Sequence, residues 1–106
     1  MKNERYKIDF SNEAEADFDN SYEYYAIESQ KVADNFYRQV NQSLKTISDN
    51  PQGFQRVFKN IRRYVIKKFP FVIYYRVENT TIQIIAVFHT SRNPEIWKQR
   101  IDNNDE

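Results

Sequence analysis

The chain has 106 residues, the size of one domain, with no cysteine, one histidine and one glycine. This composition excludes disulfides, thiol catalysis and a glycine-rich phosphate loop, and a zinc site would lack its usual ligands, so we expect neither metal nor cofactor. No apolar run approaches the roughly 20 residues of a membrane span, and the first ten residues contain no signal-peptide pattern, so we expect a soluble, cytoplasmic protein with no membrane partner.

The net charge of +1 conceals an uneven distribution of charge along the chain. Residues 1–53 hold 6 basic and 10 acidic side chains, whereas residues 54–100 hold 10 basic and 2 acidic side chains. The basic second half favours an anionic partner. The alternative is that these charges only keep an apolar sheet soluble.

The first half of the chain predicts one strand and two helices. Residues 5–10 alternate between apolar and polar side chains, which is typical of a half-buried strand. Ser11 suits a helix N-cap, and apolar side chains at helical spacing predict a helix over about 11–27. A second apolar stripe predicts a helix over about 30–48, which forms an antiparallel hairpin with the first. Asn50-Pro51-Gln52-Gly53 ends this helix, and we expect a positive φ at the glycine.

The second half has the period of strands. Residues 61–69 nearly alternate apolar and basic side chains, and residues 71–78 are aromatic and β-branched. Residues 81–89 are almost continuously apolar, which predicts a central strand covered on both faces. Asn79-Thr80 predicts a hairpin turn, and Pro94 opens a short terminal helix.

The predicted order is therefore β-α-α-β-β-β, an α+β fold in which an N-terminal helix hairpin packs on one face of an antiparallel sheet. We expect a single domain over residues 1–101 and a short, disordered acidic tail over residues 102–106. Both faces of the predicted strands contain apolar residues, which leaves two alternatives for the face that stays open.

Four phrases of the sequence occur in a characteristic order: F-S-x-x-A-x-x-D-F at 10–18 with the paired Tyr24-Tyr25, I-x-x-N-P at 47–51, I-R-R-Y-V-I-K-K-F-P-F-x-I-Y-Y at 61–75, and A-V-x-H-x-x-R-x-P-x-x-W at 86–97. Each phrase is loose by itself, but together they span roughly residues 6–100. In this order the chain resembles the RelE/ParE superfamily of bacterial toxins.

The resemblance implies the same α+β fold and the role of toxin in a type II toxin–antitoxin pair, with growth inhibition and plasmid stabilization as its consequences. A cognate antitoxin would wrap the toxin and neutralise it. Some members of the superfamily cut ribosome-bound messenger RNA, and the ParE-like branch poisons DNA gyrase. The fold does not choose between these targets, so the choice depends on the site residues. A homo-oligomer is compatible with either activity.

Metal-independent RNA cleavage needs a base, an acid, and cations that stabilise the charge of the transition state. By resemblance, Arg63 and Arg92 match basic positions of the RNA-cleaving relatives. His89 is a candidate acid or base, with a packing role as the alternative. Val72 stands where those relatives carry a phosphate-binding arginine, and no glutamate lies within residues 54–77. The catalytic candidates, Arg63, His89 and Arg92, therefore form an incomplete nuclease site.

A larger set of side chains could bind nucleic acid, an acidic antitoxin or an acidic patch on gyrase: Arg62, Arg63, Lys67, Arg76, Arg92, Trp97 and Lys98. By resemblance, Trp97 lies near a position where some nucleases carry a tyrosine that stacks on a base. The carboxylate pairs at Glu13/Asp17 and Glu15/Asp19 have helical spacing, and we interpret them as partners of the helix dipole rather than as metal ligands.

We therefore favour a ParE-like toxin that binds a macromolecular target, with DNA gyrase preferred by resemblance, and that has no catalytic activity of its own. The alternative is a metal-independent, ribosome-dependent messenger-RNA endonuclease. A further alternative is a protein with the toxin fold that is not toxic and only binds its antitoxin.

Overall fold

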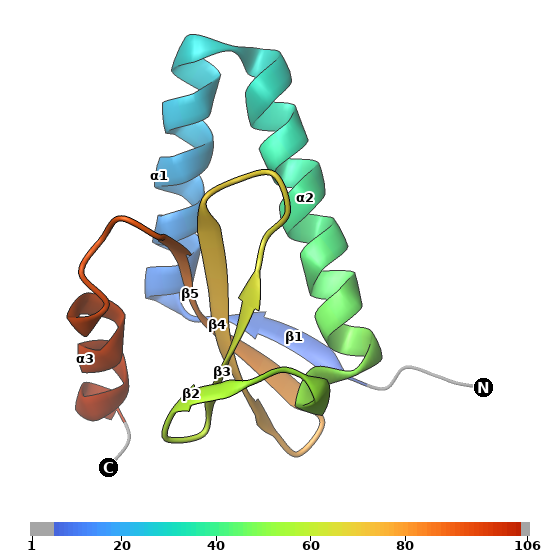
Figure 1. Ribbon diagram of the computed structural model, residues 1–106, viewed down its shortest axis with the longest axis vertical. Coiled ribbons are helices and arrows are strands. Elements are labelled where there is room, and N and C mark those ends of the chain that lie inside the picture. The colour runs from blue at the N-terminus through green and yellow to red at the C-terminus, as the bar shows by residue number, and fades with distance from the viewer. Residues whose placement is uncertain (1–5, 105–106) are drawn as a thin grey trace.

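A computed structural model describes residues 6–104 and shows a five-stranded sheet with helices on both faces (Figure 1). The elements, in chain order, are β1 (Lys7–Phe10), α1 (Asn12–Glu28), α2 (Gln30–Asp49), the 3₁₀ turn η1 (Pro51–Gly53), β2 (Arg56–Phe58), β3 (Ile61–Val65), β4 (Phe71–Glu78), β5 (Thr81–His89) and α3 (Glu95–Asn104). The strand order across the sheet is β1-β5-β4-β3-β2. The α1–α2 hairpin packs on one face and α3 on the other. No helix in the described range is long and apolar enough to span a membrane.

Two serines set the helix boundaries, as local capping predicts. The Ser11 hydroxyl accepts a hydrogen bond from the Ala14 N–H at 3.0 Å, which confirms Ser11 as the N-cap of α1. Ser29 serves both helices, because its N–H donates to the Tyr25 carbonyl at 2.8 Å and its hydroxyl accepts from the Val32 N–H at 3.3 Å. The predicted break between the helices is therefore confirmed.

The sheet differs from the prediction in its edges. The predicted spans of β4 and β5 are confirmed, and β5 is central, between β4 and β1. However, β1 pairs with β5 in parallel, so the sheet is mixed rather than purely antiparallel. The strand expected over 61–69 ends at Val65, because the chain turns at Lys68 with φ 73°. The three-residue edge strand β2 is too short for a sequence period to reveal.

The glycine of the 50–53 turn has a different role from the one predicted. No glycine in the described chain has a positive φ, so that expectation is wrong. Instead, a Cβ atom at Gly53 would lie 2.2 Å from the Asn50 Nδ2 atom. The absent side chain makes room for this close approach.

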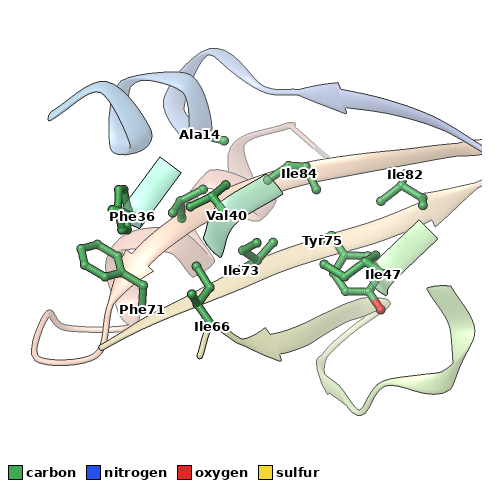
Figure 2. Packing of buried hydrophobic residues seen from close by; sticks show 11 residues of the cluster. Ala14, Phe36, Val40, Ile47, Ile66, Phe71, Ile73, Tyr75, Ile82 and Ile84 are labelled. Atoms are coloured by element: carbon green, nitrogen blue, oxygen red, sulfur yellow. The ribbon is translucent and has the colours of Figure 1, made fainter. Parts of the chain in front are cut away.

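The main core lies between the helix hairpin and the sheet (Figure 2). Figure 2 shows Phe36 and Val40 of α2 facing Ile73 and Ile84 of the strands. The Phe36 ring is fully buried in a cluster of aromatic rings formed by Phe18, Tyr25, Phe69 and Phe71. The apolar stripe that predicts α2 consists of Val32, Ala33, Phe36, Val40, Leu44 and Ile47. The structure confirms that this stripe faces the core, except that Val32 is 39% exposed.

One hydroxyl inside this core ties the sheet to the turn after α2. Tyr75 is fully buried, and its O–H donates to the Pro51 carbonyl at 2.6 Å. Burial raises the pKa of Tyr75 to about 12, an effect that the nearby charge of Arg62 partly opposes. The phenol is therefore neutral throughout the physiological range.

A β-bulge shifts the phase of β5. Tyr74 pairs with Ala86 but Tyr75 pairs with Ile84, so Ile85 has no partner on β4. Because of this extra residue, both Ile85 and Ala86 contribute to the second core, which α3 covers with Trp97. β5 is therefore buried on both faces, as its apolar sequence predicts.

The last helix is longer than expected. α3 continues through Asn104, so residues 102–104 of the predicted acidic tail belong to a helix. Residues 105 and 106 lie outside the described residues.

Candidate functional site

The structure brings the three catalytic candidates together around one depression on the α3 side of the sheet. The depression has a volume of about 220 Å³ and is lined by Arg63, Val72, Tyr74, Phe88, His89, Thr90, Arg92 and Pro94. The strand register explains the grouping, because Arg63 pairs with Tyr74 and Val72 pairs with Phe88. These residues share one face of the sheet, and α3 leaves the β3 part of it, including Arg63, exposed.

Next to this depression, the Asp17 side chain joins α1 to β5 and to α3, a role that its position in the sequence did not suggest. Beyond Phe10, β1 no longer pairs with β5, and α1 takes its place along this edge. The Ser11 N–H donates to the Ile84 carbonyl at 3.0 Å, and the Asp17 Oδ2 atom accepts from the Val87 N–H at 3.0 Å. The interpretation of Asp17 as a partner of the helix dipole is therefore wrong, since its carboxylate points at β5.

The same carboxylate holds α3. Arg100 donates to Asp17 from both terminal nitrogens, with Nη1–Oδ2 at 2.8 Å and Nη2–Oδ1 at 3.0 Å. Its Nη1 atom also donates to the Ile85 carbonyl at 3.0 Å. Because Asp17 is only 8% exposed, this bidentate ion pair links α1 to α3 in a largely water-free setting.

Arg92 lies next to this ion pair but is held more loosely. Its Nη1 atom is 3.9 Å from the Asp17 Oδ1 atom, too long for a hydrogen bond, and its side chain is 44% exposed. The guanidinium carbon lies 4.5 Å from the centre of the Phe88 ring, a cation–π contact that fixes its position. Arg92 therefore retains donors for an external group while staying in place.

His89 has a defined hydrogen-bonding state. Its Nδ1 atom accepts from the Ser91 N–H at 3.0 Å and lies 2.8 Å from the Ser91 hydroxyl. Since a backbone N–H can only donate, Nδ1 carries no proton, and in the neutral ring the proton sits on Nε2. The remaining nitrogen is then a donor rather than a base. The Phe71 ring, whose centre is 5.1 Å away, packs edge-on against the imidazole.

The depression contains no carboxylate among its lining residues, and Val72 within it is 4% exposed. Arg63, Arg92 and the His89 Nε2–H are all hydrogen-bond donors. These three groups can bind an anion, but none of them has a free acceptor for a proton while His89 is in this tautomer. Among residues 6–101, whose side chains the structure describes, no three His, Cys, Asp or Glu side chains are grouped to hold a metal ion.

Several other predicted binding residues serve the fold. Trp97 is 2% exposed and stacks on Tyr74 with ring centres 4.0 Å apart, so the interpretation of its ring as a surface for a base is wrong. This burial could not be predicted from the sequence, because a short helix does not show which of its sides meets the sheet. Arg62 donates to the Phe54 carbonyl at 2.6 Å, and Arg76 is buried and donates to the Gln83 amide oxygen at 2.8 Å.

The two predicted lysines lie outside the depression. Lys67 is exposed in the bend after β3. The Lys98 Nζ atom lies 3.8 Å from the Glu95 Oε2 atom and 5.2 Å from the centre of the Phe58 ring. The depression therefore gathers only part of the predicted set.

A second, larger hollow of about 440 Å³ adjoins the depression and shares His89 and Arg92 with it. Its other walls are Asn20, Ser21, Tyr24, Tyr25, Phe71 and Ser91. Burial, and to a lesser degree the neighbouring Tyr24, raises the pKa of Tyr25, so this wall is neutral as well as aromatic.

Known proteins share both the sequence and the fold. Residues 8–94 match the family model described as the ParE toxin of the type II toxin–antitoxin system parDE. The chain is 31% identical over 91 residues to Toxin ParE2 of two Mycobacterium tuberculosis strains, CDC 1551 / Oshkosh and H37Rv, covering 85% of this chain and 87% of each relative.

Two solved structures agree in fold. The chromosomal ParDE toxin–antitoxin system from P. aeruginosa aligns with a TM-score of 0.72 at 21% identity, covering 82% of this chain and 98% of that one. The YoeB dimer from Staphylococcus aureus aligns with a TM-score of 0.50 at 22% identity, covering 81% of this chain and 98% of that one. The chain therefore belongs to the ParE toxin family of type II toxin–antitoxin systems, within the RelE/ParE superfamily.

Proposed function

We propose that this toxin arrests growth in the cytoplasm by binding a macromolecular target, with DNA gyrase as the favoured target, and that a cognate antitoxin neutralises it. The observation that supports binding over catalysis is the set of hydrogen-bond donors around the depression. Arg63, Arg92 and the Nε2–H of His89 surround it, and no carboxylate lines it. RNA cleavage without a metal needs a base for the 2′-hydroxyl proton, and these residues supply none in the neutral tautomer.

The choice of gyrase rests on family membership. The matched family model is that of the parDE toxin, and the sequence resembles the branch of the superfamily that poisons gyrase. An antitoxin partner is supported by the P. aeruginosa structure, which is described as a chromosomal ParDE toxin–antitoxin system. The charge of residues 54–100, with 10 basic and 2 acidic side chains, suits an acidic protein partner.

The test is induction of the chain without antitoxin, with three parallel readouts: growth, messenger-RNA integrity, and supercoiling by gyrase. We expect growth arrest and loss of supercoiling with intact messenger RNA. Arg92→Gln should reduce growth arrest and the loss of supercoiling only in part, because it removes one contact among several. Arg38→Gln on α2 is the matched control and should leave both unchanged. Growth arrest with normal supercoiling and intact RNA would refute the choice of target.

The alternative, a ribosome-dependent messenger-RNA endonuclease, is kept because Arg63, His89 and Arg92 line one depression. In that case the residues act on a charge that exists only in the transition state, and Arg92→Gln should lower the cleavage rate by about 10²-fold or more. Site-specific cleavage of ribosome-bound RNA that this substitution abolishes would replace the binding mechanism by catalysis. A chain that is harmless at high expression would instead support the non-toxic alternative.

A further inference from the structure

We propose that Ser91 is a nucleophilic serine, that His89 acts as its general base, and that the hydroxyl takes an acyl group from an activated carboxylic ester. The second hollow, which both residues line, holds the apolar part of this ester. This inference goes beyond the proposed function, because it concerns covalent chemistry at one hydroxyl rather than the binding of a macromolecular target.

The hydroxyl of Ser91 donates its proton toward the His89 ring. The Nδ1 atom accepts from the Ser91 N–H at 3.0 Å and therefore carries no proton of its own. The Ser91 Oγ atom lies 2.8 Å from the same nitrogen, so in this contact the hydroxyl must be the donor. A serine hydroxyl within about 2.6–3.2 Å of an imidazole nitrogen has the geometry of an activated nucleophile. Nδ1 is thus closed to an external hydroxyl, but it is placed to take the proton of Ser91.

The turn after β5 holds the two side chains at this distance. The Arg92 N–H donates to the His89 carbonyl at 3.1 Å, which closes a β-turn. Inside the turn, the Thr90 N–H donates to the Pro70 carbonyl at 2.9 Å and ties the turn to the segment before β4. The Phe71 ring packs edge-on against the imidazole, with ring centres 5.1 Å apart. The nucleophile and its base therefore meet in a geometry that the backbone fixes in advance.

The second hollow gives an ester access to this hydroxyl. Ser91 is exposed, and the hollow of about 440 Å³ that it lines is large enough for a small aromatic or aliphatic group. Tyr24 and Tyr25 supply apolar walls. Arg92 lines the same hollow, and its half-exposed guanidinium can donate to an oxyanion that forms there. The nucleophile, its base, a cation and an apolar space thus occur in one place.

The reaction is a transfer of the acyl group with release of the alcohol of the ester. The Ser91 Oγ atom attacks the carbonyl carbon, and its proton passes to the His89 Nδ1 atom. The carbonyl oxygen becomes an oxyanion, which Arg92 stabilises. The bond from the carbon to the leaving oxygen then breaks, and this oxygen takes the proton from Nδ1. The products are acyl-Ser91 and a neutral alcohol or phenol, so atoms and charge balance.

The test exposes the full chain to para-nitrophenyl butyrate, an ester with an apolar acyl group and a good leaving group. Release of nitrophenol is followed by its absorbance, and the acyl group is located by mass spectrometry of the digested chain. We expect a burst of nitrophenol equal in amount to the protein, with the acyl group on Ser91. Ser21, which lines the same hollow from α1, is the internal comparison and should remain unmodified.

Three variants separate an activated serine from a merely exposed one. Ser91→Ala should abolish the burst. His89→Gln keeps a polar side chain but supplies no base, and it should slow acylation by about 10²-fold or more. Thr46→Ala removes an exposed hydroxyl on α2 that donates to the Gln42 carbonyl, and it should leave the burst unchanged. The fluorescence of Trp97, the sole tryptophan, shows whether each variant keeps α3 in place.

Absence of a burst, or an equal rate of acylation in His89→Gln and the native chain, would overturn the proposal. Acylation of lysine or tyrosine side chains with Ser91 unmodified would overturn it as well. The assay contains neither gyrase nor ribosomes, so its result is independent of the proposed target.

Discussion

Replacing Asp17 by asparagine tests the buried ion pair that joins α1 to α3. Asparagine has nearly the same shape and can still accept the hydrogen bond from the Val87 N–H. It cannot match the charge of Arg100, which in the native chain makes two contacts of 2.8 and 3.0 Å to the carboxylate. The substitution therefore isolates the electrostatic tie of α3 to the rest of the fold.

The expected loss is large because the carboxylate is almost fully buried. Removing one partner of a buried ion pair costs about 3–5 kcal/mol. Arg100 keeps its hydrogen bond to the Ile85 carbonyl and its side chain is 14% exposed, so we expect a loss at the lower end of this range, about 3 kcal/mol. For a domain of this size each kcal/mol lowers Tm by roughly 4–8 °C, so we expect a decrease of about 12–24 °C.

Trp97 makes the effect on α3 visible. It is the sole tryptophan of the chain, and its side chain, 2% exposed, packs from α3 against the sheet, so its emission reports whether α3 is docked. We expect a red-shifted emission in Asp17→Asn before the far-UV circular dichroism changes on heating. The control is Asp19→Asn, an exposed acid on the same helix. A loss in unfolding free energy no larger than that of the control would refute the reasoning.

Three further substitutions test the rest of the fold. Phe36→Ala removes a fully buried ring, and urea denaturation should show a loss of about 3–5 kcal/mol; an unchanged midpoint would mean that α2 faces the sheet differently. Tyr75→Phe leaves the Pro51 carbonyl without its donor, at a cost of about 1–3 kcal/mol. Because the pKa of Tyr75 is raised from 10.0 to about 12, the native protein should lose stability as pH rises from about 10 to 12, and the variant should show a smaller loss in urea titrations across that range. Ser11→Ala removes the cap that binds the Ala14 N–H, and thermal unfolding should show a cost of about 0.5–2 kcal/mol, against no cost if the first turn is held by other contacts.

The parts of the fold that the sequence predicts well depend on short-range signals. Capping serines and apolar spacing place both ends of the helix hairpin, and the apolar runs of β4 and β5 give their spans. The parallel pairing of β1 with β5 was missed because Lys7 and Thr81 are far apart in the chain. Nothing local distinguishes a parallel from an antiparallel partner for a four-residue strand.

Of the residues at the candidate site, some were predicted from the sequence and others were missed or misinterpreted. Family resemblance predicted Arg63, His89 and Arg92, and the structure shows that all three line one depression. The strand register accounts for Arg63, which pairs with Tyr74, whereas His89 and Arg92 lie at and after the end of β5. Asp17 stood in a run of acids that all suit the start of a helix, and its true partners lie 70 and 83 residues away. Trp97 was misjudged because a short terminal helix does not reveal which of its sides is covered.

The parallel pairing of the first strand with the last one has a consequence for synthesis and folding kinetics. Within the described residues β1 pairs with β5 and with no other strand, so this pairing cannot be completed until residue 84 has been made. At roughly 5–20 residues per second, the helix hairpin waits several seconds on the ribosome with its apolar face uncovered. We therefore expect a chain that stops before β5 to give an aggregation-prone fragment rather than a weaker toxin, because the sheet can form fully only when β5 is present.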